Sequence, residues 1–117
     1  MAADKIIIFH NPRCSKSREA LGLLNEANCE IEVVEYLKDA PSFDTLKALI
    51  AKLGIEPQAL LRTGETIFKE NYKGKTLNAD QWIQAMVKHP VLIERPIVIN
   101  GNKAVIGRPP VLVTSIL

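Results

Sequence analysis

Residues 6–24 of the chain read IIIFHNPRCSKSREALGLL, and the order of residue types in this stretch predicts a strand, a loop and a helix. The apolar run 6–9 is short and rich in β-branched residues, which favours a buried strand. A polar loop with Cys14 follows, and from 15 to 27 the apolar residues recur at helical spacing. We therefore expect Cys14 to lie at or just before the N-terminus of a helix.

This position favours a negative charge on Cys14. Free backbone amides and the positive end of the helix dipole meet at a helix N-terminus. Arg13, Lys16 and Arg18 add positive charge nearby, as does His10 if it is protonated. Each effect favours the thiolate over the thiol, so we expect Cys14 to be acidic and nucleophilic. The same groups would hold an anionic substrate beside the sulfur.

The two cysteines have different surroundings in the sequence. A free cysteine is most often a small buried core residue, but the charged and hydroxyl neighbours of Cys14 fit that alternative poorly. Cys29 follows the predicted helix without a cationic cluster around it, so we expect it to be a structural or incidental thiol.

The composition is that of one compact domain, 1–117. Of the 117 residues, 47% are hydrophobic and 24% are charged. A net charge of +2 is too small to indicate a nucleic-acid partner. No apolar run approaches the ~18 residues that span a membrane, and residues 1–5 lack the long apolar segment of a secretory signal. We expect a cytoplasmic monomer with reduced thiols and no membrane partner.

The remaining segments complete an α/β pattern. The run 31–36 alternates as a second strand, which makes a β-α-β unit. Between about 42 and 90 the pattern is helical: Ser42 and Gly54 bracket one helix, and Asn78 with Gln81 indicates the start of another.

The C-terminal third predicts a β-hairpin and a short helix. Two apolar runs, 96–99 and 103–106, flank Asn100-Gly101, which is a turn sequence, and a short helix follows from Gly107. The full order is that of a thioredoxin-like fold with a mixed four-stranded sheet. In this chain a helical insertion, about 42–90, separates the βαβ half of the fold from its ββα half.

Three arginines each follow an apolar run: Arg62, Arg95 and Arg108. A guanidinium suits tetrahedral oxyanions because its planar fork donates paired hydrogen bonds and stays charged. Taken one at a time, each is more simply interpreted as a surface residue with weak ion pairs. The sequence alone does not show that the three meet.

Four motifs resemble the glutaredoxin-coupled arsenate reductase (ArsC) family. They are HNPRCSKSR at 10–18, ALLR at 59–62, HPVLIERPIV at 89–98 and RP at 108–109. They occur in the family's order from about 6 to 117. The basic loop and the early end of the chain are similar to the chromosomal, YfgD-like subgroup of that family.

The resemblance implies a role for each motif residue. Cys14 is the implied nucleophile, and Arg62, Arg95 and Arg108 are the implied ligands of the arsenate or arsenite group. His10, Ser17 and Arg18 would keep the sulfur ionised. Pro96 would follow a cis peptide bond and set the local geometry.

The resemblance also implies the reaction. The Cys14 thiolate attacks arsenate, glutathione acts as co-substrate, and a glutaredoxin resolves the resulting mixed disulfide. Two histidines and two distant cysteines do not make a zinc site, so we expect no metal and no bound cofactor.

Three alternative functions make different demands on the same residues. Spx transcription regulators, which bind RNA polymerase, share the fold but typically carry Cys-x-x-Cys, whereas this chain has Cys14 and Ser17 at those positions. A Cys-x5-Arg phosphatase is excluded because Ala20 stands where its arginine should be. A monothiol glutaredoxin-like oxidoreductase fits the cysteine but leaves the three arginines without a role.

Overall fold

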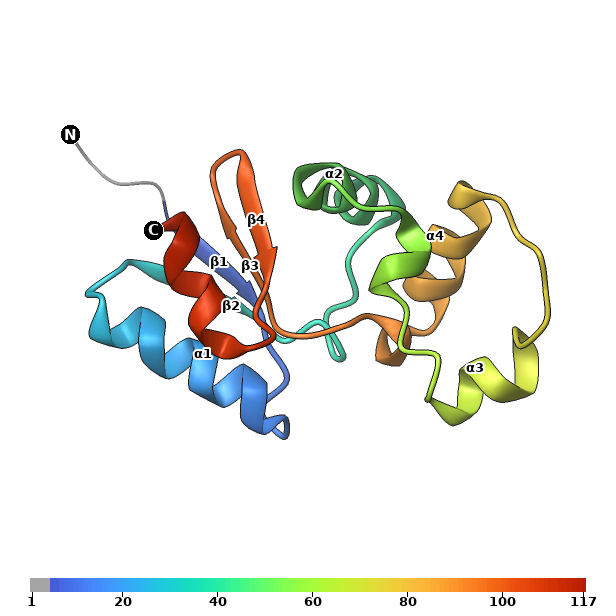
Figure 1. Ribbon diagram of the computed structural model, residues 1–117, viewed down its shortest axis with the longest axis horizontal. Helices are drawn as coiled ribbons and strands as arrows, with labels where there is room; N and C mark the ends of the chain where they lie inside the picture. Colours follow the sequence, from blue (N-terminus) through green and yellow to red (C-terminus); the bar gives the residue numbers. More distant parts are fainter. Residues whose placement is uncertain (1–4) are drawn as a thin grey trace. The chain divides into compact units, whose positions relative to one another are not determined.

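A computed structural model describes residues 5–117, and their contacts divide into two units (Figure 1). One unit combines the N-terminal part up to Asp39 with Arg95–Leu117, and the other is Ala40–Glu94. Residues 1–4, on which the expectation about a secretory signal partly rests, lie outside the described residues. No helix in the described part of the chain has the length and apolar character needed to span a membrane.

The first unit is built on a four-stranded mixed sheet in the order β2-β1-β3-β4. The central strand β1 pairs in parallel with β2 and antiparallel with β3. Its elements are β1 (Ile6–Phe9), α1 (Ser15–Glu26), β2 (Ile31–Val34), β3 (Ile97–Asn100), β4 (Lys103–Ile106) and the 3-10 helix η3 (Pro110–Ile116). This confirms the predicted mixed sheet with its βαβ and ββα halves.

The register of the sheet determines what lies beside the Cys14 loop. Phe9, the last residue of β1, pairs with Ile97, the first residue of β3. The loop that follows β1 and the segment that precedes β3 therefore lie at the same end of these two central strands.

The helices α1 and η3 pack on the sheet through one hydrophobic core (Figure 1). In α1 the fully buried residues are spaced at helical intervals, so one face of the helix is covered. Ser17 lies on that covered face. The buried core residues are Ile6, Ile8, Ala20, Leu24, Val98, Val113 and Ile116.

The second unit is helical and contains the predicted insertion 42–90. The Ser42 side chain caps α2 by accepting from the Thr45 amide, and Gly54 ends that helix with a φ of +68°. Asn78 and Gln81 form the predicted capping box of α4. The elements are α2 (Phe43–Leu53), η1 (Pro57–Leu60), α3 (Thr66–Asn71), α4 (Ala79–Lys88) and η2 (Pro90–Leu92).

Two predicted details of the first unit are wrong. The second strand ends at Val34 and does not reach residue 36. The hairpin turn is made by Gly101 and the residue after it, because Asn100 stays in the strand and pairs with Lys103. Asn100 is held there because its side-chain amide donates to the Ile116 carbonyl at 2.6 Å.

Gly107 provides a test of the packing next to the Cys14 loop. Its amide donates to the Pro96 carbonyl at 2.8 Å, and a Cβ at this position would lie 2.8 Å from Pro96 Cγ and 3.0 Å from Val113 Cγ1. Neither atom belongs to a flexible side chain, so we expect Gly107→Ala to lower the free energy of unfolding by about 1–3 kcal/mol. Urea unfolding followed by circular dichroism measures this change.

Gly22, inside α1, is the matched control. A Cβ there would meet nothing within 4 Å. Gly22→Ala should therefore raise the free energy of unfolding by roughly 0.5–1 kcal/mol, because alanine favours a helix interior. An equal loss of stability in both variants would contradict the packing argument.

Candidate active site around Cys14

Cys14 is the N-cap residue of α1, which confirms the position predicted for it. Its backbone is extended and its side chain is 8% exposed. The Cys14 amide donates to the Asn11 carbonyl at 3.0 Å and closes the loop, while its carbonyl accepts from the Arg18 amide at 3.0 Å. The amides of Ser17 and Lys16 donate to the sulfur. The free amides of the first helical turn are thus directed at Cys14 Sγ.

Two arginines from the C-terminal part of the chain contact the same sulfur. The Arg95 side chain is hydrogen-bonded to Cys14, and Arg108 Nη2 lies 4.0 Å from Sγ. Arg108 Nε also donates to the Arg95 carbonyl at 2.9 Å, which links the two residues. The Arg95–Pro96 bond is cis, as the resemblance implies, and Arg108–Pro109 is also cis.

These contacts lower the pKa of the Cys14 thiol. Burial alone raises the pKa, because a buried thiolate loses its hydration. The hydrogen bond from Arg95, the Ser17 amide, the charge of Arg95 and the Lys16 amide act in the opposite direction and outweigh burial. The site therefore favours a nucleophilic thiolate that faces two guanidinium groups.

His10 and Ser17 form a buried pair behind the loop. His10 Nδ1 lies 2.6 Å from Ser17 Oγ, and the Asn11 amide donates to the same hydroxyl at 3.0 Å. Burial lowers the pKa of His10, the nearby Glu35 carboxylate opposes this, and Arg18 lowers it further, with a net decrease. The lowered pKa disfavours a positively charged ring, because His10 lies in the protein interior. The role predicted for His10 in keeping the sulfur ionised stays a prediction. The contact that the structure shows for His10 is with the Ser17 hydroxyl. Ser17 lies in the first turn of α1, whose amides donate to Cys14 Sγ.

The Arg18 side chain links α1 to the loop that precedes Cys14. Its Nη1 donates to the Pro12 carbonyl at 2.9 Å, and the Arg13 amide donates to Asn11 Oδ1 at 3.0 Å. Both bonds restrain the backbone that leads into Cys14. The role predicted for Arg18 in stabilising the thiolate stays a prediction.

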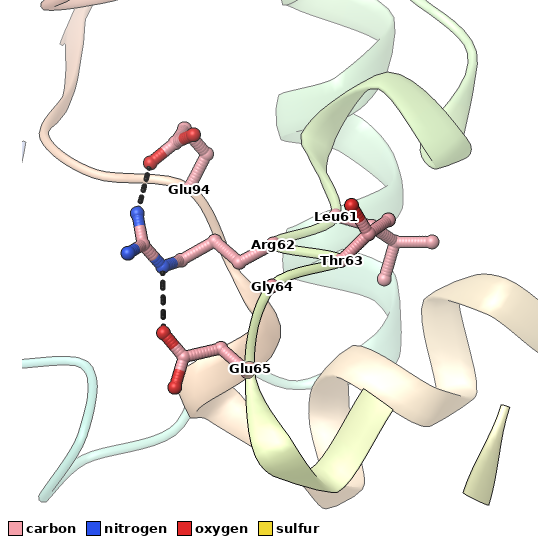
Figure 2. A pocket seen from close by; sticks show the side chains of 6 residues that line it. All are labelled: Leu61, Arg62, Thr63, Gly64, Glu65 and Glu94. Carbon is pink, nitrogen blue, oxygen red and sulfur yellow. Dashed lines mark hydrogen bonds and ion pairs between the residues drawn. The ribbon is translucent and has the colours of Figure 1, made fainter. Parts of the chain in front are cut away.

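Arg62 belongs to the second unit, and the structure shows its immediate surroundings. Residues 60–62 and 92–94 pair antiparallel: the Arg62 amide donates to Leu92 at 2.8 Å, and the Glu94 amide donates to Leu60 at 2.9 Å. The pairing brings Arg62 beside Glu94, and Figure 2 shows its guanidinium between Glu94 and Glu65. Whether Arg62 joins the two arginines at Cys14 stays a prediction.

The two glutamates are the residues that the sequence analysis missed. Burial acts to lower the pKa of Arg62, but hydrogen bonds to Glu65 and Glu94 raise it above its ordinary value. Glu65 lies only three residues after Arg62, so this ion pair joins neighbours in the sequence. The contact with Glu94 depends on the pairing of two distant segments, which no local pattern reveals.

Cys29 is partly buried, and both cysteines are free thiols. The Cys29 side chain packs against the hydrophobic core of the first unit. Across residues 5–117 there is no group of three or more His, Cys, Asp or Glu side chains that could hold a metal ion.

The mixed sheet, the cysteine at the start of α1 and the adjacent cis-proline define a thioredoxin-like protein with a single cysteine at its candidate site. The family model described as "ArsC family" matches residues 9–116, and the chain belongs to this family.

Relatives and solved structures agree with this assignment. The chain is 47% identical to the uncharacterised protein YfgD of Escherichia coli K12 over 97% of each chain. It is 44% identical to an arsenate reductase of Neisseria meningitidis serogroup B, covering 90% of this chain and 92% of that one. Its structure matches an arsenate reductase from Vibrio cholerae with a TM-score of 0.94 and 44% identity, over 99% of this chain and all of the other. The predicted thioredoxin-like fold is confirmed.

The pKa of Cys14 tests the contact with Arg95. In a Cys29→Ser background, the rate of alkylation by iodoacetamide should rise with pH around a midpoint below that of a free cysteine. Arg95→Gln should move this midpoint upward, because it removes a hydrogen bond and a positive charge that both favour the thiolate.

Arg13→Gln is the matched control for that experiment. Arg13 is exposed on the same loop, and its substitution removes the same charge. We expect a much smaller change in the midpoint. Equal shifts in the two variants would show that general positive charge, and not the contact with Arg95, lowers the pKa.

Proposed function

We propose that this protein is an arsenate reductase in which Cys14 is the nucleophile. The observation that carries the proposal is that the Cys14 thiol, whose pKa is lowered, lies against the guanidinium groups of Arg95 and Arg108. A bare thiol oxidoreductase needs the acidic cysteine but not two cations beside it. Similarity to proteins named arsenate reductase supports the same substrate.

The first step joins sulfur to arsenic. The Cys14 thiolate attacks the arsenic of arsenate, an S–As bond forms, and one arsenate oxygen leaves as water after taking up protons. Negative charge on the remaining oxygens is stabilised by Arg95 and Arg108, which already lie beside the sulfur. Following the resemblance, Arg62 supplies a third guanidinium to the oxyanion, and Pro96 sets the backbone geometry beside Arg95.

The second step reduces the arsenic. The glutathione thiolate attacks Cys14 Sγ, the S–As electron pair moves to arsenic, and As(V) becomes As(III), which leaves as arsenite. Cys14 is then joined to glutathione in a mixed disulfide, and a glutaredoxin thiol restores the free cysteine by disulfide exchange. Glutathione is thus a co-substrate, and the reaction uses no bound cofactor. We propose that the protein works as a monomer. We place it in the cytoplasm, because the glutathione pool there is reduced.

A coupled assay tests the function directly. Arsenate-dependent NADPH oxidation is measured with glutathione, glutaredoxin and glutathione reductase. We expect activity with the wild type, none with Cys14→Ser, and nearly full activity with Cys29→Ser, because Cys29 packs against the core and lies outside the proposed chemistry.

Other outcomes separate the alternatives. A folded but inactive Cys29→Ser would replace the glutathione scheme with an intramolecular disulfide cycle. A wild type that reduces glutathione mixed disulfides but not arsenate would favour the glutaredoxin-like oxidoreductase. Absence of both activities, with binding to RNA polymerase, would favour the Spx-like regulator.

A further inference from the structure

Arg62 is held between two carboxylates at an open pocket of about 390 Å³. Its Nε donates to Glu65 Oε2 at 3.1 Å and its Nη1 donates to Glu94 Oε1 at 2.6 Å (Figure 2). Neither of these bonds uses Nη2. The three side chains are between 21% and 29% exposed, so they are partly screened from water but open to a ligand. The pocket is lined by Leu61, Arg62, Thr63, Gly64, Glu65 and Glu94.

The charges at this pocket do not suit a fully ionised anion. One guanidinium and two carboxylates sum to a net charge of −1, so an oxyanion that approaches Arg62 also meets two negative groups. An oxyanion that carries an acidic O–H has a way to offset this repulsion, because its O–H can donate to a carboxylate oxygen. A carboxylate oxygen has more than one acceptor site, so it can accept from the ligand and from Arg62 at once. Such charge-assisted hydrogen bonds are the stronger ones.

We propose that Glu65 and Glu94 make the Arg62 pocket selective for protonated tetrahedral oxyanions. Near neutral pH arsenate and phosphate carry at least one O–H, whereas sulfate carries none. The pocket would then accept arsenate and reject sulfate by an unfavourable contact with the same carboxylates. This inference rests on the proposed function, in which Arg62 contacts the oxyanion.

The test compares three anions in the coupled assay. The quantities measured are the KM for arsenate and the inhibition constants of sulfate and phosphate, for the wild type and for Glu65→Gln and Glu94→Gln. In each variant the ratio of the sulfate inhibition constant to the arsenate KM should fall by roughly tenfold, because one repulsive carboxylate is gone. The corresponding ratio for phosphate should stay unchanged, since phosphate and arsenate both carry the O–H.

Glu70→Gln is the matched control. Glu70 is exposed on α3, in the same unit, and its substitution changes the net charge equally. Its ratios should equal those of the wild type. If the two glutamates had only a structural role, their substitution would lower the free energy of unfolding but would change the sulfate and phosphate ratios equally.

Three results would overturn the inference. Equal changes for sulfate and phosphate in Glu65→Gln and Glu94→Gln would show an effect of charge alone. An unchanged arsenate KM in Arg62→Lys, with normal turnover, would show that this pocket does not hold the oxyanion, while the proposed function stands. No arsenate turnover by the wild type would remove the proposed function and the inference together.

Discussion

The contact between the Cys14 sulfur and the donors around it is the interaction on which the candidate site depends. Burial raises the pKa of the thiol, so without compensation the sulfur would be protonated and a poor nucleophile. The compensation comes from two sources: the amides of the first turn of α1 and the side chain of Arg95. The first is local, whereas the second requires β1 and β3 to pair so that Phe9 meets Ile97. The acidity of Cys14 is therefore a property of the folded sheet as well as of the loop.

The features that the sequence predicted well are those with local causes. The N-cap position of Cys14, the capping box of Asn78 with Gln81, and the ends of α2 at Ser42 and Gly54 all depend on residues within one helical turn. The order of strands and helices was sufficient for the mixed sheet, because a βαβ unit and a hairpin have few ways to combine. The position of Arg95 and Arg108 near Cys14 was predicted only from the family resemblance, because their distance from Cys14 along the chain gives no indication of it.

The features that the sequence did not predict depend on burial and on distant pairing. His10 looks like a possible imidazolium in a cationic loop, but its ring is buried and its pKa is lowered. Arg62 taken alone is interpreted as a surface residue with weak ion pairs, but the pairing of 60–62 with 92–94 brings Glu94 to it and leaves it partly buried. In both cases the sequence shows the residue type, and the fold decides its surroundings: burial for His10 and two carboxylates for Arg62.

Protection of Cys14 by arsenate tests the central claim, that an acidic sulfur and its guanidinium groups form one oxyanion site. The measurement is the rate of iodoacetamide alkylation of Cys14 in the Cys29→Ser variant, with and without arsenate, at a fixed pH and ionic strength. If arsenate binds against the sulfur, alkylation slows in a saturable way, and Arg95→Gln weakens the protection. An alkylation rate that is the same with and without arsenate would contradict the account.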